Sequence, residues 1–497
     1  MSAAALVFPH QLFADHPALD GATRVVLVED DLYFRDAHHP ARHHKLRLVL
    51  HRASMARYAE RLRSLGHAAE TAEWAARRSL GDVVAGLAAG GVTRLRVCDP
   101  GDFLLEKRLA TAATAASVAL DVVDSPGFLN TRADNAELLG GKTRVRMDAF
   151  YRRQRQRLGI LVDADGQPAG GQWSFDADNR QKLTPAALAD VPPVPAVAQD
   201  AVIAEARAYV ERHFPDHLGA SGPLPYPTDH AGAAAWLGVF VTERLARFGP
   251  FEDAVEPGTS HLYHAVITPM LNTGLLTPRQ VLDAVLAAGT PGVPLNSLEG
   301  FVRQLIGWRE YMRATYDSAG VTMRTANMWG FSRRLPDAWY TGETGLVPVD
   351  DVIRRVLATG YANHIERLMV LGTALFLTRI RPDDVFTWFH EMFVDAYDWV
   401  MVPNTYGMSQ HAAGPIITTK PYFNGSNYLR KMSHYPRGPW EAEWDGLFWT
   451  FVRDYREQVA GYNRIGMLAK TAERMAPETM AAHDAAAQRY LARVGLA

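Results

Sequence analysis

The sequence predicts an N-terminal α/β domain with a doubly wound parallel sheet, followed by a large all-α domain. Within residues 1–125, short apolar runs bounded by turn residues alternate with segments of helical periodicity. This alternation is typical of a parallel sheet covered by helices. Residues 201–497 show helix-period segments one after another without strand alternation. The intervening residues 126–200 are rich in turn residues, so we expect an inter-domain connector.

In the first region, four apolar runs are expected to form strands: residues 6–8, 25–29, 95–99 and 119–123. Helical periodicity appears at 45–65 and again at 83–89. The first strand is not followed by Gly-x-Gly-x-x-Gly, and the region has no P-loop lysine motif. A standard dinucleotide or nucleoside-triphosphate site is therefore not expected here.

In the third region, seven segments are expected to be helical: residues 201–213, 231–247, 278–288, 297–316, 349–359, 364–377 and 446–457. A further helical segment is expected to open at Gly258-Thr259-Ser260-His261-Leu262 and to end at Gly274. The small hydroxyl residues there are interpreted first as N-caps. Alternatively, the exposed N–H groups of such a turn bind phosphate.

Composition excludes several classes of protein. The chain has 497 residues, a formal net charge of −2 and one cysteine, Cys98. A single cysteine excludes an intrachain disulfide, a thiolate zinc site and a four-cysteine iron–sulfur cluster. No His/Asp/Glu cluster shows a metal-site spacing, so no metal is expected. The sequence has no signal-peptide pattern and no apolar run long enough to span a membrane. We therefore expect a cytoplasmic protein that does not interact with membranes.

Two stretches are locally basic although the whole chain is almost neutral. The first contains Lys142, Arg144, Arg146, Arg152, Arg153, Arg155 and Arg157, and is interpreted as a solvated helix face. The second, residues 401–440, contains no acidic residue and interleaves basic side chains with aromatic ones. Cations neutralise phosphates and aromatic rings stack on unpaired bases, so this composition suits a nucleic-acid groove. The alternative is a loop-rich packing segment with ordinary surface arginines.

Other side chains have more than one interpretation. Arg309 beside Glu310 is interpreted as an ion pair on a helix. Arg367 could pair with Asp395, although spacing alone does not show this. Trp388, with Tyr397 and Trp399 further along, fits either a helical core or a chain of electron carriers.

Taken together, these segments resemble the prokaryotic (6-4) photolyases and related bacterial cryptochromes, the branch usually named for its iron–sulfur cluster. The resemblance rests on motifs that recur in order along nearly the whole chain: residues 43–45, 50–55, 147–152, 170–180, 307–311, 364–369, 407–410 and 419–422. Each motif is weak by itself, whereas their order and spacing are specific.

The resemblance implies that the helical domain binds FAD in a folded conformation. Thr259, Ser260 and Leu262 match the turn that contacts the phosphates, and Glu299, Arg303 and Trp308 match the helix that lines the flavin. Arg367 and Asp395 match a salt bridge beside the isoalloxazine ring. In the N-terminal domain the resemblance implies an antenna, 6,7-dimethyl-8-ribityllumazine, near Gln11, Glu29, Tyr33 and His44.

In this family, light-excited reduced flavin passes an electron to a UV photoproduct that is flipped out of the duplex. His364 matches the histidine that donates a proton to a (6-4) lesion, a role suited to a side chain that titrates near neutrality. Asn363, Met408 and Tyr422 match other positions of the lesion pocket. Residues expected to contact UV-damaged DNA are Arg152, Arg153, Arg180, Lys420, Arg430 and Lys431. The protein is expected to act as a monomer.

The sequence also departs from the family pattern. The four cluster cysteines are absent, with Pro348 near the first and residues 435–440 near the next. Asn363 replaces a histidine, and Met401 stands at an acidic position. In the expected electron chain Trp388 is kept, whereas Phe389 and Tyr340 are substitutions. Two alternatives to repair therefore stay open: a blue-light photoreceptor of cryptochrome type, and a flavoprotein without light function.

Overall fold

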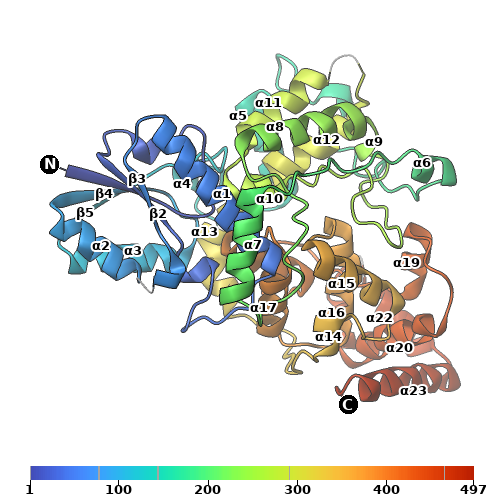
Figure 1. Cartoon of the computed structure of the whole chain (residues 1–497). Coiled ribbons are helices and arrows are strands. Elements are labelled where there is room, and N and C mark those ends of the chain that lie inside the picture. The colour runs from blue at the N-terminus through green and yellow to red at the C-terminus, as the bar shows by residue number, and fades with distance from the viewer. Residues whose placement is uncertain (1, 77–78, 143–144, 290–291, 464) are drawn as a thin grey trace.

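A computed structural model describes residues 2–76, 79–142, 145–289, 292–463 and 465–497 (Figure 1). Among these residues the N-terminal region forms a five-stranded parallel sheet in the order β3-β2-β1-β4-β5. Its strands are β1 (Ser2–Val7), β2 (Arg24–Val28), β3 (Ala69–Ala72), β4 (Val92–Cys98) and β5 (Ala119–Val123). Strand order runs outward in both directions from β1, which confirms the predicted doubly wound sheet.

Three helices accompany this sheet: α1 (Lys45–Ser64), α2 (Leu80–Ala89) and α3 (Phe103–Ala115). In Figure 1, α2 and α3 lie side by side along one side of the sheet. The sequence did not predict β3 or α3. The four residues of β3 include a glutamate and no large apolar side chain, while many positions of α3 are alanine and threonine, so the apolar pattern is weak in both.

The connector contains three helices: α4 (Arg132–Leu139), α5 (Met147–Leu158) and α6 (Pro185–Ala189). Most of the basic run lies on or near α5, and Arg152 and Arg153 are exposed as predicted. Arg155 is fully buried instead. Its guanidinium can be buried because it donates hydrogen bonds to the backbone carbonyl groups of Ile160, Leu161 and Trp173. Arg144, also part of this run, lies outside the described residues.

The remaining chain is helical, as predicted. Its α-helices are α7 (Ala201–His213), α8 (His230–Val239), α9 (Leu245–Phe248), α10 (Thr268–Thr273), α11 (Pro278–Ala288), α12 (Leu295–Val302), α13 (Glu310–Arg324), α14 (Ala338–Thr341), α15 (Val347–Thr359), α16 (Thr373–Leu377), α17 (Pro382–Met392), α18 (Asp398–Val402), α19 (Ser426–Met432), α20 (Pro439–Asp454), α21 (Arg456–Ala460), α22 (Gly466–Arg474) and α23 (Pro477–Arg493). Within the described part of the chain, no helix has the length and apolar character needed to cross a membrane.

π-Helical segments interrupt or join several of these helices. They are η5 (Phe240–Arg244), η6 (Arg303–Arg309), η7 (Glu366–Gly372) and η8 (Pro403–Ser409). π-Turns are rare and are often found at functional sites. Here η6, η7 and η8 carry Arg303, Arg367 and Met408, three residues that the resemblance implies for the flavin site or the lesion pocket.

The helix expected to open at Gly258 is absent. Residues 258–267 form a loop, and α10 begins only at Thr268. Leu262 and Val266 in this loop have φ angles of 41° and 52°. Such positive angles are incompatible with a right-handed helix and are costly for a β-branched residue. The N-cap interpretation of Thr259 and Ser260 is therefore wrong.

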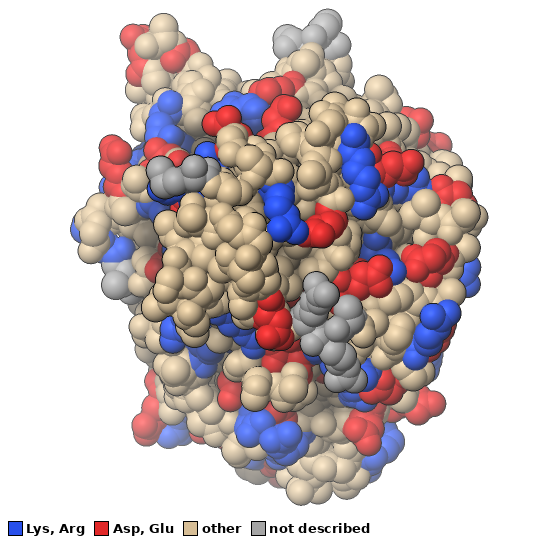
Figure 2. Space-filling model, turned by 60° about the vertical axis from the view of Figure 1, so that its left-hand side comes forward, with Lys and Arg blue, Asp and Glu red and all other residues tan. Residues whose placement is uncertain are grey.

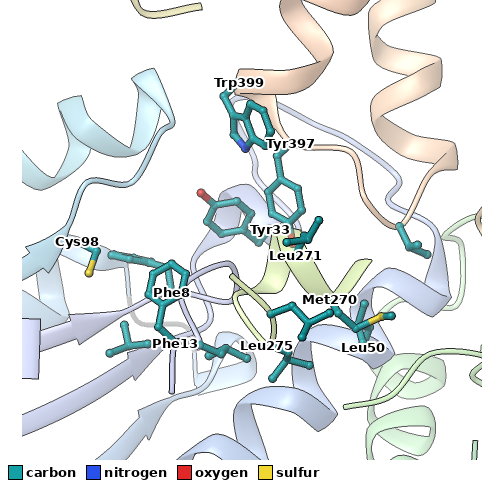
Figure 3. Packing of buried hydrophobic residues seen from close by; sticks show 14 of the residues in the cluster. Phe8, Phe13, Tyr33, Leu50, Cys98, Met270, Leu271, Leu275, Tyr397 and Trp399 are labelled. Atoms are coloured by element: carbon teal, nitrogen blue, oxygen red, sulfur yellow. The ribbon is translucent and has the colours of Figure 1, made fainter. Parts of the chain in front are cut away.

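The sheet and the helices share one hydrophobic core. Figure 3 shows Phe8 and Tyr33 from the loops that follow β1 and β2 packed near Leu271 of α10 and Tyr397, which precedes α18. These residues belong to a single contiguous cluster of buried side chains. The N-terminal region therefore buries its sheet edge against the helical region, and the two parts support each other.

Tryptophan packing occupies the segment 435–449, which includes positions where the resemblance would place cluster cysteines. Trp440 and Trp444 of α20 are buried, while Trp449 is half-buried. The indole N–H of Trp440 donates to the Pro436 carbonyl (3.0 Å), and that of Trp444 donates to the Asn424 carbonyl (2.8 Å). Apolar packing and indole hydrogen bonds thus hold this segment.

Replacing Trp444 with alanine is expected to destabilise the helical region by about 3–5 kcal/mol, because a large cavity and an unpaired carbonyl remain. Urea unfolding followed by circular dichroism measures the loss. Trp449→Ala is the matched control, since this half-buried side chain on the same helix should cost much less. Equal unfolding midpoints for wild type and Trp444→Ala would show that the packing account is wrong.

Candidate active site

A bidentate ion pair between Arg367 and Asp395 is the centre of the site. The Nη1–Oδ1 and Nη2–Oδ2 distances are 2.9 and 3.0 Å, and Arg367 Nε donates to the Ala362 carbonyl at 2.8 Å. The guanidinium also lies over the ring of Phe393, 4.2 Å from its centroid. Burial alone would lower the pKa of Arg367, but the charge and hydrogen bonds of Asp395 raise it. The predicted pairing is confirmed, and Asp395 favours the charged form of Arg367.

Two residues of α10, Thr268 and Asn272, fix Asp395 in place. The Thr268 hydroxyl donates to the Asp395 carboxylate, and the Asn272 side chain donates to the Asp395 carbonyl at 2.8 Å. Arg309 in turn donates to the Asn272 side chain at 2.7 Å. The sequence suggested an ion pair between Arg309 and Glu310. The structure shows instead that the Glu310 carboxylate accepts the backbone N–H groups of residues 129 and 130.

A second cation, Arg355 of α15, lies at the turn that contains Ser260. Its guanidinium donates to the Ser260 hydroxyl, to Glu366 at 2.6 Å and to Asp351 at 3.0 Å. Its Nε atom is buried without a hydrogen-bond partner among the described residues. A guanidinium beside a hydroxyl-bearing turn is well suited to a phosphate. The sequence analysis did not single out Arg355.

Several buried polar atoms near these groups also have no partner within the described chain. They are His261 Nδ1, His264 Nε2 and Asn363 Nδ2. An unsatisfied buried polar atom costs roughly 1–3 kcal/mol, so several in one region point to a ligand that satisfies them. A cavity of about 240 Å³ adjoins His261 and is lined mainly by apolar side chains, among them Tyr226 and Trp236.

Glu299 and Arg303 form a tightly bonded network beside this region. Glu299 accepts hydrogen bonds from the Tyr151 hydroxyl (2.8 Å) and the Phe175 amide (2.9 Å). Arg303 lies 3.4 Å from Glu299 and 3.5 Å from Glu252. Trp308 is half-buried further along η6, with its ring edge-to-face against Tyr311. Of the three residues expected on the flavin-lining helix, Glu299 and Arg303 thus contact each other, whereas Trp308 packs against Tyr311.

His364 is the exposed member of an otherwise buried stretch. Its side chain is 43% accessible, and its Nε2 lies 3.4 Å from the Asp253 carboxylate. Its ring also lies edge-to-face with His264, with centroids 5.5 Å apart. Enclosure by the protein lowers the pKa of His364, but the hydrogen bond and charge of Asp253, with the charge of Glu252, outweigh this and raise the pKa above 6.5. The protonated ring is therefore favoured.

Asn363 acts as a cap for the helical segment that carries Arg367. The side-chain oxygen of Asn363 accepts the backbone N–H of Glu366 at 2.9 Å. The backbone N–H of Asn363 donates to the Glu366 carboxylate at 3.1 Å. This reciprocal arrangement is a capping box. The substitution of the family's histidine by Asn363 is thus compatible with the local backbone, and it leaves His364 as the accessible imidazole.

Replacing Asp253 with asparagine should lower the pKa of His364, because the ring loses its main anionic partner. The pKa of His364 is higher in the folded protein than its unfolded value of 6.5. Its contact with Asp253 therefore stabilises the fold fully at pH values below 6.5. This stabilisation is lost as the pH rises through the folded-state pKa. Histidine NMR titration of wild type and variant measures the midpoint. Asp178→Asn, at an exposed connector carboxylate, is the control. An unchanged His364 midpoint would contradict the assignment.

Met408 and Tyr422 have separate surroundings. Met408 is half-buried on η8 and packs against the core cluster that includes the sheet. Tyr422 is half-buried against the second cluster, which is formed by the C-terminal helices, with Lys420 Nζ 5.7 Å from its ring centroid. The structure therefore leaves their assignment to one lesion pocket a prediction.

The candidate DNA-binding residues come from distant segments, and some lie close to His364. Arg180 is exposed and lies 3.9 Å from Asp253, the partner of His364. Lys182 Nζ donates to the Arg430 carbonyl at 3.4 Å, so the connector and α19 are neighbours. Lys431 is exposed beside Arg430. Basic side chains from 180–182 and 430–431 thus lie together near the accessible histidine.

The acid-free stretch 401–440 divides between core and surface. Tyr406, Tyr435 and Trp440 are buried, which fits the packing alternative for these rings. On the face of the molecule drawn in Figure 2, basic and acidic side chains are interspersed rather than gathered into one basic field. Any contact with DNA on that face therefore depends on a few local side chains.

At the N-terminal sheet, Gln11 and Tyr33 lie in one cluster with His10. Gln11 donates to the Cys98 carbonyl at 2.9 Å, and the rings of Tyr33 and His10 are 4.9 Å apart. Gln11 Oε1 and His10 Nδ1 are buried without partners among the described residues. These loops follow β1 and β2, next to the point where strand order reverses, which is the usual ligand site of such sheets.

Glu29 and His44, the other two candidate antenna residues, are engaged elsewhere. Glu29 pairs with Arg52 at 2.8 Å and accepts the Trp74 N–H at 2.9 Å. Burial raises the pKa of Glu29 although Arg52 opposes this. His44 caps α1 through Nδ1, and its Nε2 contacts the carbonyl groups of Val356 and Leu357. Both ring nitrogens of His44 are therefore occupied by backbone.

Comparison with known proteins identifies relatives along the whole chain. A family model described as deoxyribodipyrimidine photo-lyase-related protein matches residues 5–226. A protein named (6-4) photolyase from Agrobacterium fabrum is 32% identical over 503 aligned residues, which cover 97% of each chain. A deoxyribodipyrimidine photo-lyase from Thermus thermophilus is 28% identical over 45% of this chain and 51% of its own.

Two solved structures share the fold. The crystal structure of a bacterial class III photolyase from Agrobacterium tumefaciens aligns with 100% of this chain and 98% of its own, with a TM-score of 0.57 and 16% identity. A cryptochrome from Synechocystis sp. PCC6803 aligns with 97% of this chain and 93% of its own, with a TM-score of 0.56 and 16% identity. Both combine an N-terminal parallel sheet with a large helical region, which supports the fold assignment.

Proposed function

The chain belongs to the photolyase and cryptochrome family, and we propose that it is a FAD-dependent photolyase that repairs (6-4) photoproducts in UV-damaged DNA. The full-length relative named (6-4) photolyase supports this activity. The observation that carries the lesion type is His364, an accessible imidazole whose charged form Asp253 favours. Family membership implies a flavin chromophore, which supplies a light-excited electron when it is bound and reduced.

The described residues fit a flavin dinucleotide. Arg355 and the hydroxyl-bearing turn at Ser260 offer a cation and donors for its phosphates. The Arg367–Asp395 pair offers a fixed positive and a fixed negative group to the edge of a polar heteroaromatic ring. The unpartnered atoms His261 Nδ1 and Asn363 Nδ2 are further donors or acceptors in the same region. We therefore assign FAD to this site.

In the proposed reaction, His364 holds and moves the proton. The imidazolium donates a proton to the lesion as the lesion accepts the electron. The oxygen that the lesion had moved between the two bases then returns to its original base, the bond between the bases breaks, and the electron would return to the flavin. The neutral imidazole recaptures its proton from the restored thymines. Asp253 keeps the ring charged before the transfer and orients it afterwards through Nε2. A positioned acid of this kind contributes roughly 10²–10⁴-fold to a rate.

DNA would be held near His364 by Arg180, Arg430 and Lys431. These cations attract phosphates, while the cost of extruding a base is lowest where the base is already damaged. Lys420, Arg152 and Arg153 would extend the contact. Only a few cations lie near His364. The protein would therefore distinguish damaged from undamaged DNA mainly through the lesion itself.

We further propose a lumazine antenna at the sheet edge and a fold without an iron–sulfur cluster. Tyr33, His10 and Gln11 offer aromatic faces and unpartnered polar atoms to a flat heteroaromatic ring. The segment 435–440, where the resemblance places cluster cysteines, contains the buried rings of Tyr435 and Trp440, and the only cysteine of the sequence, Cys98, lies buried in β4. Acid extraction of the purified protein, followed by chromatography of the released chromophores, tests both FAD and lumazine.

A cryptochrome-type photoreceptor is the second candidate. The replacements at Phe389, Met401 and Asn363 favour it, since each removes a group that the resemblance associates with electron or proton transfer. Flavin content does not separate the two functions, whereas DNA binding does.

Binding to three matched duplexes separates the candidates: one with a (6-4) lesion, one with a cyclobutane dimer and one undamaged. For a (6-4) photolyase we expect at least roughly tenfold tighter binding to the (6-4) duplex than to the undamaged one, because extrusion of a damaged pair costs a kcal/mol or more less. Equal affinity for all three duplexes would favour the photoreceptor. A preference for the cyclobutane duplex would contradict the assigned lesion.

A further inference from the structure

Asp351 of α15 links its own helix to two distant segments through one oxygen atom. Its Oδ2 accepts the Tyr435 hydroxyl at 2.6 Å, an Nη2 hydrogen bond from Arg355 at 3.0 Å and the backbone N–H of Gly258 at 3.4 Å. Tyr435 lies just before α20, and Gly258 opens the turn that contains Ser260. A phenol, a guanidinium and the start of the proposed phosphate-binding turn therefore meet at a single carboxylate.

These contacts fix the direction of the Arg355 guanidinium. Its Nη2 is held by the carboxylates of Asp351 and Glu366, and its Nη1 donates to the Ser260 hydroxyl. Burial alone would lower the pKa of Arg355, but the charge and hydrogen bond of Glu366 raise it, so the group stays charged. Because a guanidinium is a rigid planar fork, two held nitrogens also fix the third. That third nitrogen, Nε, is buried without a partner among the described residues, so it is the donor left for a ligand.

Tyr435 is placed to hold Asp351 in this arrangement. Tyr435 is 6% exposed and packs among the C-terminal helices, whereas the Asp351 side chain is 26% exposed. Burial, followed by the charges of Glu366 and Asp351, raises the pKa of Tyr435, so its hydroxyl keeps its proton and donates. A fixed buried donor restricts the conformations of a carboxylate that water can reach. Such support from outside the binding site keeps the group that touches the ligand in one orientation.

The backbone around Tyr435 is anchored by other contacts. The Met432 carbonyl accepts the Val255 N–H at 3.1 Å, which ties this segment to the stretch before the turn. The Trp440 indole N–H donates to the Pro436 carbonyl at 3.0 Å. Loss of the Tyr435 hydroxyl alone would therefore leave the segment in place, and the effect of that hydroxyl on Asp351 can be measured separately from the fold.

We propose that Tyr435 and Asp351 are positioning residues for the phosphates of the flavin dinucleotide. They hold the Arg355 guanidinium and the turn 258–260 as one unit, and they act through these groups without touching the phosphates themselves. The proposal rests on the proposed function, in that Arg355 and this turn bind the phosphates of FAD. It assigns a role in cofactor binding to the segment before α20, which lies far from Arg355 in the sequence.

Titration of the flavin-free full-length protein with FAD and with riboflavin tests the proposal, because riboflavin carries the same ring system and no phosphate. Tyr435→Phe keeps the buried ring and removes only the hydroxyl. It should weaken FAD binding roughly tenfold, the lower end for a hydrogen bond to a charged group, and leave riboflavin binding unchanged. Asp351→Asn should also weaken FAD binding alone. Tyr406→Phe is the matched control, because Tyr406 is also buried and donates to a carboxylate, Asp383, at 2.7 Å; both affinities should equal those of wild type.

A double variant shows whether Tyr435 acts through Arg355. Once Arg355→Met has removed the guanidinium, adding Tyr435→Phe should weaken FAD binding no further, since residues that act through one contact are not additive. Additive losses, equal losses for FAD and riboflavin, or unchanged FAD binding in Tyr435→Phe would overturn the proposal. Tighter FAD binding in Asp351→Asn would also overturn it, because Asp351 would then only repel the phosphates. A wild type that binds no FAD would instead overturn the proposed cofactor, and the positioning role with it.

Discussion

Replacing Asp395 with alanine is expected to destabilise the helical region by about 3 kcal/mol, because Arg367, whose side chain is only 22% exposed, is left without its partner. The same change should abolish flavin binding, since the pair is the fixed charge centre of the proposed site. Urea unfolding measures the first effect, and the flavin absorbance of the purified protein measures the second.

A double variant separates the two consequences. Arg367→Met with Asp395→Leu removes both charges and fills the space with apolar groups, which should recover much of the lost stability without restoring flavin. Asp395→Asn should be intermediate, because the amide still accepts one hydrogen bond from Arg367 and one from Thr268. A fully stable Asp395→Ala protein that retains flavin would contradict the central role of the pair.

Replacing His364 with asparagine is expected to slow (6-4) repair by at least roughly 10²-fold, the lower end of what a positioned proton donor contributes. His364 is 43% exposed and its contact with Asp253 is a partly exposed ion pair, so the melting temperature should fall only slightly and the flavin spectrum should stay unchanged. Single-turnover repair under saturating light measures the effect. His434→Asn is a control, since His434 is also partly exposed and paired with a carboxylate, Glu256, but lies on another segment.

The repair rate of His364→Asn distinguishes two roles. A loss in repair with unchanged lesion binding assigns the proton to His364. If only lesion binding were weakened, His364 would be a DNA contact and not a proton donor. If the repair rate were unchanged, His364 would have no part in the reaction.

Periodic apolar patterns predicted the architecture well. Helices α7 and α11 begin and end where the sequence pattern does, and β5 matches its apolar run. These segments alternate strongly apolar with polar positions, so local sequence and tertiary packing agree. The apolar pattern was weakest at β3, which has only four residues, and at α3, which contains many small side chains. Neither segment shows a clear alternation of large apolar and polar residues.

The site was predicted only where the resemblance covers its residues. Arg367 lies in the motif 364–369, the resemblance implies Asp395 as its partner, and their pairing is confirmed. Arg355, Asp253 and Thr268 were not found, because each acts through a contact between segments far apart in the chain, and a lone charged or hydroxyl residue gives no signal in sequence. Arg155 was misjudged because the carbonyl groups of the turn after α5 and of Trp173 enclose its charge, which the basic pattern alone does not reveal.

The loop at 258–267 shows a different limit. Its composition suits a helix start, but Leu262 and Val266 adopt left-handed backbone angles that no local propensity favours. Such angles persist only where the surroundings impose them, and they are frequent at ligand sites. The misprediction thus falls at the turn proposed to hold the flavin phosphates.

Light-dependent restoration of thymines in a duplex with one (6-4) lesion tests the account most directly. The reduced, flavin-loaded protein is mixed with the duplex, one sample is illuminated with blue light and the other kept dark, and the products are separated by chromatography. The account predicts restored thymines in the light and none in the dark. An illuminated sample in which the protein binds the duplex, its flavin is fully reduced and no thymine is restored would contradict it.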